Sequence, residues 1–188
     1  MSVISSIDAE YKRYKALAEA AINQVTDDEL IRTGPGESNS IEMLVRHVTG
    51  NLKSRFTDFR TSDGEKPWRH RDGEFEPASL DRGRLLVEWN EAWQVLFAAI
   101  ANLSDADLSE AVTVRRQPLR IDEALHRSLA HAAYHVGQIV YLAKAMRAHG
   151  WHCLSIPRGA SQAYNQAPTN ETAVAHTSKL VTPGGSGS

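Results

Sequence analysis

Cysteine is nearly absent from this sequence, which has only Cys153 in 188 residues. A single cysteine excludes an internal disulfide framework and also excludes a metal site built from several thiolates. A metal centre in this chain would therefore depend on histidine and carboxylate ligands.

Long apolar runs are also missing from the chain. No stretch approaches the roughly 18 consecutive apolar residues of a membrane-spanning helix, and the N-terminal segment lacks the apolar core of a signal peptide. We therefore expect a cytoplasmic protein with no membrane partner.

The charges favour neither sign. There are 21 Lys and Arg residues and 23 Asp and Glu residues, so the formal net charge is −2, and the two signs are interspersed along the chain. A nucleic-acid-binding surface usually leaves a basic excess in the sequence. We therefore expect no nucleic-acid partner.

The composition fits one domain with a sizeable core, since 41% of the residues are hydrophobic and 23% are charged. Few large apolar residues follow Arg158, and the last six residues read PGGSGS, which is typical of a flexible linker. We expect a domain over residues 1–158 and a C-terminal extension over residues 159–188, flexible or partly packed, that ends in this Gly/Ser segment.

Apolar residues recur at spacings of three and four over long stretches, which predicts amphipathic helices at about residues 4–25, 40–59, 79–102 and 122–149. The second helix is expected to start near Asn39 or Ser40. Residues 61–77 form a charged, Gly- and Pro-containing loop that is long enough to cross the length of a helix, and residues 112–121 are expected to be extended. The predicted fold class is an all-α four-helix bundle with a long crossover between its second and third helices.

His131 and His135 lie four residues apart in the last of these helices. Side chains at this spacing share a helix face, with Cβ atoms about 5–6 Å apart, so two ring nitrogens can meet one ion at about 2.0–2.1 Å. The rest of the helix is apolar, so we expect both imidazoles to be inside and to need a partner. His47, in the second helix, is a candidate third ligand. Satisfied core histidines are the alternative, because eight histidines yield about 0.3 pairs at any given spacing by chance.

The other histidines carry less weight. His126 is about 140° round the helix from His131 and is expected at the surface. The remaining four fall in loops or in the tail and are expected to be solvated; they are His70, His149, His152 and His176.

The segments SIEMLVRHV at residues 40–48 and HAAYHVGQI at residues 131–139 resemble the DinB-like (YfiT-like) superfamily of metal-binding four-helix bundles. The second segment, with a histidine one helical turn before His-x-Gly-Gln-Ile, is the more specific. The similarity covers about residues 1–157 in the order and length of the elements. The segment LSIPRG at residues 154–159, followed by Tyr164 and Asn165, is similar to the ending of an uncharacterised branch of this superfamily.

This resemblance implies an up-down-down-up bundle. It also implies a site for Zn²⁺ or Ni²⁺ in which His47, His131 and His135 are the ligands and water completes the shell. Relatives of this kind include transferases and isomerases that use low-molecular-weight thiols, and they are often homodimers. The partners implied are therefore a small-molecule thiol, an electrophile and a second copy of the chain.

A three-histidine centre with an open position supports more than one chemistry. A divalent metal lowers the pKa of a bound thiol, which becomes a nucleophile, or of a bound water, which can attack an ester or amide. The metalloprotease signature His-Glu-x-x-His is absent, because Ala132 and Ala133 follow His131. We therefore favour a metal-dependent thiol S-transferase, with a non-catalytic metal-binding or interaction bundle and a metal-dependent hydrolase as the alternatives.

Polar residues near the three histidines are candidate second partners. Asn51 lies one helical turn after His47, and Tyr134 and Gln138 flank His135. Their side chains can hydrogen-bond to a ligating imidazole or contact a substrate. A polar contact between helices is the alternative.

A group of arginines precedes the last helix. Arg116 and Arg120, together with Arg115, present guanidinium groups that suit a carboxylate of a cosubstrate. The alternative is a solvated basic loop, because surface charge clusters are common.

Overall fold

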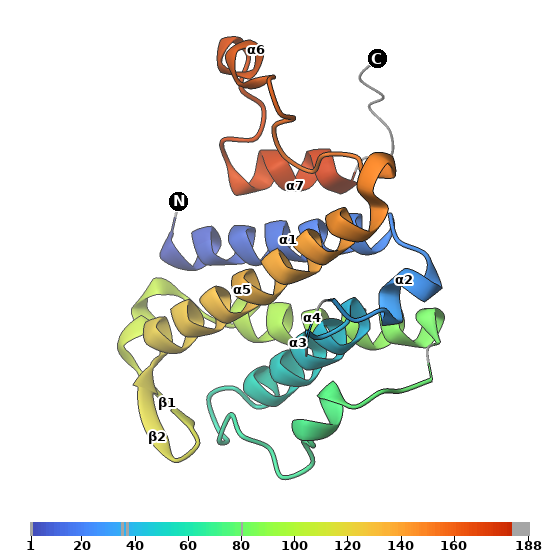
Figure 1. Cartoon of the computed structure of the whole chain (residues 1–188). Helices are drawn as coiled ribbons and strands as arrows, with labels where there is room; N and C mark the ends of the chain where they lie inside the picture. The colour runs from blue at the N-terminus through green and yellow to red at the C-terminus, as the bar shows by residue number, and fades with distance from the viewer. Residues whose placement is uncertain (1, 35, 37, 80, 182–188) are drawn as a thin grey trace.

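The structure is a computed structural model that describes residues 2–34, 36, 38–79 and 81–181. This part of the chain is mostly helical, in line with the predicted all-α class (Figure 1). The long helices are α1 (Val3–Ile22), α3 (Ile41–Phe56), α4 (Arg82–Ala101) and α5 (Ile121–Arg147). The shorter ones are α2 (Asp27–Ile31), α6 (Ser161–Gln166) and α7 (Ala173–Val181), with 3-10 turns η1 (Asp72–Phe75), η2 (Asp105–Ser109) and η3 (Ala148–Gly150).

Three of the long helices begin at a residue whose side chain accepts a hydrogen bond from the first turn. Such a cap satisfies a backbone N–H that has no partner within the helix. Ser2 caps α1 in this way, Asp81 caps α4, and Ser40 accepts from the N–H of Met43 at 3.1 Å to start α3. Ser40, rather than Asn39, is therefore the N-cap of the second long helix.

The core lies between the long helices. α1 packs against α5 and α4, and α3 packs against α4 and α5. Tyr11, Trp89 and Trp93 are fully buried between them, and the Tyr11 hydroxyl donates a hydrogen bond to the Leu125 carbonyl at 3.1 Å. This packing holds α3 and α5 side by side, and these are the two helices that carry the candidate ligands.

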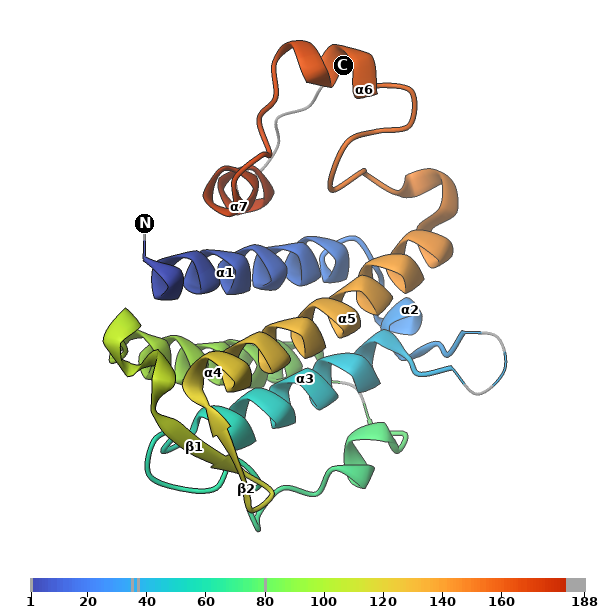
Figure 2. The ribbon, with the colours of Figure 1, turned by 90° about the vertical axis from the view of Figure 1, so that its left-hand side faces the viewer.

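A short hairpin departs from the all-helical expectation. Strands β1 (Ala111–Val114) and β2 (Gln117–Arg120) pair antiparallel in the stretch that was expected only to be extended. Arg115 and Arg116 form its two-residue turn, with φ of 52° and 63°, which is the backbone sign of the type I′ turn preferred by tight hairpins. The hairpin lies beside the connection between α3 and α4 (Figure 2).

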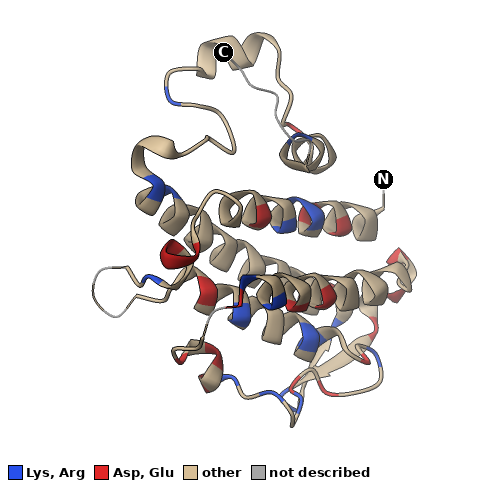
Figure 3. Cartoon of the chain, turned by 90° about the vertical axis from the view of Figure 1, so that its right-hand side faces the viewer, with Lys and Arg blue, Asp and Glu red and all other residues tan. Residues whose placement is uncertain are grey.

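The connection between α3 and α4 covers the outer side of α3. It runs over residues 57–81 and contains η1, which contacts α3. Basic and acidic residues both occur along this part of the chain (Figure 3). The connection is therefore a packed segment that brings loop residues to one face of α3.

The C-terminal segment folds back on the domain, with α7 lying against α1 (Figure 2). His176 on α7 is only 6% exposed, and its Nε2 lies 2.8 Å from the Leu154 carbonyl, so the expectation that this histidine is solvated is wrong. The Gly/Ser segment at residues 182–188 lies outside the described residues. No described helix is both long and apolar enough to cross a membrane.

Candidate metal centre

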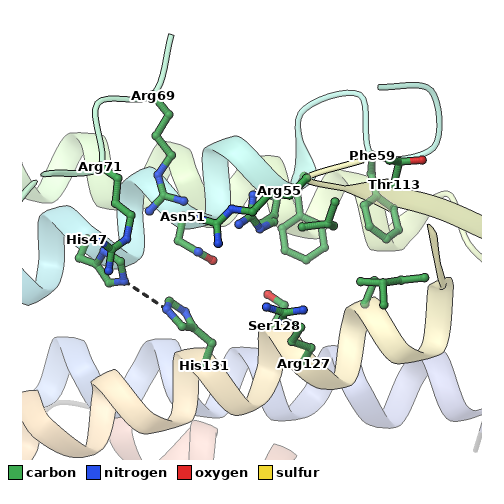
Figure 4. A pocket seen from close by; sticks show the side chains of 15 residues that line it. His47, Asn51, Arg55, Phe59, Arg69, Arg71, Thr113, Arg127, Ser128 and His131 are labelled. Carbon is green, nitrogen blue, oxygen red and sulfur yellow. Dashed lines mark hydrogen bonds between the residues drawn. The ribbon is translucent and has the colours of Figure 1, made fainter. Parts of the chain in front are cut away.

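Three imidazoles from two helices meet in one place. His47 extends from α3, and His131 and His135 extend from successive turns of α5. The Nε2 atoms of His47 and His131 are 3.1 Å apart (Figure 4), and the three ring centroids are separated by 4.5 to 5.1 Å. One potential ligand atom from each residue lies within 4.8 Å of the others.

This arrangement fits a metal ion. Two nitrogens that each bind a tetrahedral ion at about 2.0–2.1 Å are separated by about 3.3–3.4 Å, close to the 3.1 Å between His47 and His131. Without an ion, two imidazole nitrogens at this distance must share a proton between them. The three histidines therefore form a group that can hold a metal ion.

Two hydrogen bonds orient the rings. His47 Nδ1 lies 2.8 Å from Glu74 Oε2, and His135 Nδ1 lies 2.8 Å from Gln138 Oε1. Because both oxygens are acceptors, each of these Nδ1 atoms is the donor, and a neutral imidazole with its proton on Nδ1 has an unprotonated Nε2. A partner of this kind on the far nitrogen fixes the tautomer and the direction of a metal-ligating histidine.

Glu74 is itself held in place. Arg69 donates two hydrogen bonds to its carboxylate, from Nε at 2.8 Å and from Nη2 at 3.0 Å. Burial alone would raise the pKa of Glu74, but the hydrogen bonds from His47 and Arg69 outweigh it and lower that pKa. Glu74 is therefore an ionised acceptor, and it approaches α3 at Gly50, where a Cβ atom would lie 2.1 Å from Oε1.

The imidazoles of His131 and His135 are neutral at ordinary pH. Burial, together with the neighbouring His135 and His47, lowers the pKa of His131 to about 3. Burial also lowers the pKa of His135, although its hydrogen bond to Gln138 acts in the opposite direction. Neutral imidazole is the form that binds a metal, so both rings are in the ligating state.

A cavity of about 200 Å³ opens beside His47 and His131 (Figure 4). Its walls come from α3, α5, the hairpin and the connection between α3 and α4. The residues that line it include Asn51, Phe56, Phe59 and Ser128. No aspartate or glutamate is found among the described residues of the lining. A small molecule in this cavity would reach the histidine group directly.

One family model matches most of the chain. The model of a family described as "Protein of unknown function (DUF1572)" matches residues 1–160. The chain belongs to the DUF1572 family. This family lies within the DinB-like superfamily. The match includes all three histidines and ends just before α6, and no curated protein and no solved structure matches the chain significantly.

The predicted polar neighbours take different positions in this DUF1572 protein. Gln138 contacts His135 as described above, and Asn51 lines the cavity. Tyr134 is 64% exposed, and its ring centroid lies 4.9 Å from that of His135. Tyr134 therefore packs against the His135 ring and is itself largely exposed.

The predicted arginines take different positions around the hairpin. Arg115 lines the cavity, whereas Arg116 and Arg120 are not among its lining residues. Both are exposed, and Arg120 forms an ion pair with Asp122. Arg115 is therefore the member of this group that the fold brings to the site.

Several residues near the site were not predicted from the sequence. Glu74, Arg69 and Arg71 come from the connection, and Arg55 and Arg127 come from α3 and α5. A signal was available in Gly50, which lies three residues after His47 in an otherwise ordinary helix and marks a close approach by another segment. The charged composition of the loop alone did not indicate which of its residues would meet α3.

Proposed function

We propose that this DUF1572 protein binds Zn²⁺ or Ni²⁺ through His47, His131 and His135 and activates a low-molecular-weight thiol for transfer to an electrophile. The observation that carries the proposal is that the imidazoles of His47, His131 and His135 converge within 4.8 Å of one another, and that His47 and His131 line a cavity. A purely structural metal site is normally closed by four protein ligands, whereas a catalytic site keeps one position open. Three histidines beside a cavity fit the second kind.

Bound there, a divalent ion would act as a Lewis acid that lowers the pKa of a coordinating thiol. The chain's own residues provide the setting. Glu74 and Gln138 bind Nδ1 of His47 and of His135, so that Nε2 of each ring would face the ion, and Arg69 holds Glu74. The Phe75 ring, with its centroid 4.8 Å from that of His47, shields this imidazole from water.

Thiol activation is better supported than hydrolysis. Hydrolysis needs a general base near the attacking water, and no Asp or Glu is found among the described residues that line the cavity. The nearby Glu74 is already bound to His47 and Arg69. A thiol needs no such base, because it can lose its proton to bulk solvent once its pKa is lowered.

A non-catalytic metal-binding bundle is the second candidate. His47 is on α3 and the other two histidines are on α5, so a bound ion would join two helices and stabilise the fold. This candidate predicts loss of thermal stability on chelation and no response to any thiol.

We also propose that the four long helices form an up-down-down-up bundle. The supporting observations are that α3 and α4 run the same way in Figure 1 and that residues 57–81 join them. The packing of α1 on α5 and of α3 on α4 fits this order.

Replacement of His131 tests the metal centre. We expect close to one transition-metal ion per chain in the wild type and almost none in His131→Ala, measured by elemental analysis after dialysis. His126→Ala is the matched control, because His126 is exposed on the same helix. A wild-type protein without metal, whose melting temperature does not change with a chelator, would contradict the proposal.

Thiol binding is tested on the cobalt-substituted protein. We expect the visible absorption bands of Co²⁺ to shift when cysteine is added and to remain unchanged with serine, which differs only in its hydroxyl group. Indifference to cysteine and to other small thiols would leave the non-catalytic bundle as the better explanation.

A further inference from the structure

The cavity beside the histidine group is lined by five arginines from four segments. These are Arg55 of α3, Arg69 and Arg71 of the connection, Arg115 of the hairpin turn and Arg127 of α5 (Figure 4). The described lining residues include no aspartate or glutamate. The cavity is therefore strongly basic, although the whole chain has a net charge of −2.

Two carboxylates behind the cavity wall neutralise part of this charge. Glu65 accepts a hydrogen bond from Arg55 at 3.2 Å and another from Arg115 at 2.8 Å. Glu74 accepts from Arg69. Three guanidinium groups thus share two carboxylates.

The other two arginines lack a comparable partner. Arg71 lies 3.5 Å from Asp72, whose side chain is 97% exposed, and its guanidinium is 5.4 Å from the centroid of the Phe75 ring. Arg127 is exposed and has no hydrogen bond or ion pair within the described part of the chain. Both can turn toward a ligand without breaking a buried contact.

The close approach of these cations has an electrostatic cost. Burial lowers the pKa of Arg55, and the charges of Arg69 and Arg115 lower it further, although Glu65 opposes them. An anion in the cavity would relieve this repulsion, and guanidinium groups bind carboxylates and phosphates through paired hydrogen bonds.

We propose that the cavity binds the acidic group of a small organic acid, a carboxylate or a phosphate, through Arg71 and Arg127. The volume of about 200 Å³ is below the roughly 300–1,000 Å³ of pockets for drug-sized ligands, so the ligand is small. Because His47 and His131 line the same cavity, an acid held there has its other end at the histidine group. Only this last placement rests on the function proposed above.

Calorimetric titration with succinate and with inorganic phosphate tests the proposal. We expect at least one of them to bind, and the arm that responds identifies the acid. Arg71→Gln and Arg127→Gln should each weaken binding about tenfold, as expected for the loss of one charge-assisted contact. Arg120→Gln is the control, because Arg120 is exposed, pairs with Asp122 and lies outside the cavity lining, so its affinity should be unchanged.

A histidine variant separates this proposal from the proposed function. His135 is part of the metal group but not of the cavity lining, so His135→Ala should lose the metal and keep its affinity for the acid. Failure of both acids to bind, or equal affinities for Arg127→Gln and Arg120→Gln, would overturn the anion site whatever the metal content. If Arg127→Gln does not fold, Arg127→Lys replaces it in the titration. The anion site would then be overturned if Arg127→Lys and Arg71→Gln both bind the acid as tightly as the wild type does.

Discussion

Gly50 determines how closely the connection approaches the candidate metal centre. It lies on α3 less than one turn after His47, and the Glu74 carboxylate occupies the space where any other residue would have its Cβ atom. That carboxylate contacts both His47 and Arg69. The absence of one methyl group therefore allows a loop residue to orient a helix residue.

Gly50→Ala should weaken metal binding while making helix α3 itself more stable. Alanine is favoured over glycine within a helix by about 1 kcal/mol, so the helix itself gains stability. The displaced Glu74 would release His47, and loss of such a partner typically lowers metal affinity about 10–100-fold. Competition with a chromophoric chelator measures the affinity, and thermal unfolding measures the stability.

Gly137→Ala is the matched control, because a Cβ atom at this position on α5 meets nothing within 4 Å. It gives the same gain in helix propensity without touching Glu74. Equal metal affinities for the two variants would show that Glu74 does not orient His47.

At the level of elements, one aspartate joins the connection to the hairpin. Asp63 Oδ1 accepts hydrogen bonds from the backbone N–H groups of Glu65 and Arg115 at 2.7 and 2.8 Å, and Oδ2 accepts from that of Arg116 at 2.7 Å. Gly64 adds a backbone hydrogen bond to Thr113. The hairpin turn, with its two positive φ angles, is thus held by a segment distant in sequence.

Asp63→Asn should lower the melting temperature at neutral pH, because an amide offers one acceptor oxygen where the carboxylate uses two. These backbone hydrogen bonds lower the pKa of Asp63. A lowered folded-state pKa stabilises the protein above the unfolded-state pKa of about 3.9, and this contribution is lost as the pH falls through the folded-state value. The difference between the wild type and the variant should therefore shrink as the pH is lowered below about 4.

Melting curves at several pH values measure this effect. Asp72→Asn is the control, since Asp72 is in the same connection with a side chain that is 97% exposed. A difference that stays constant into acid would show that the charge of Asp63 is not involved.

At the scale of the whole molecule, the features that could be predicted from the sequence are those that follow a helical spacing of residues. The apolar spacing identified the four long helices, and the spacing of His131 and His135, with the resemblance of the segment around His47, identified the group that can hold a metal. The ends of the elements were less well predicted, because residues 112–121 carry no signal that distinguishes an extended stretch from a hairpin.

The loop and turn residues that surround the cavity are brought there by the path of the backbone, which leaves no periodic pattern in the sequence. Arg115 and Arg116 are adjacent, and only the backbone of the turn decides that Arg115 faces the cavity. Glu74 and Arg69 belong to a connection whose path is set by contacts with α3 and the hairpin. The part of the site on α3 and α5 could therefore be predicted from the sequence, whereas the part contributed by the connection and the hairpin turn could be identified only from the structure.

The connection between α3 and α4 has a further consequence, for susceptibility to proteases. It contains Arg60, Arg69 and Arg71, after which trypsin cleaves, and it is tied to the candidate metal centre through Glu74. Ion binding should stabilise this tie and slow cutting in the connection, as followed by mass spectrometry of the fragments. Cleavage after the exposed Arg158, far along the chain, should proceed at the same rate with and without the ion. Limited digestion would thus show whether an ion is bound at the three histidines, even while the substrate is unknown.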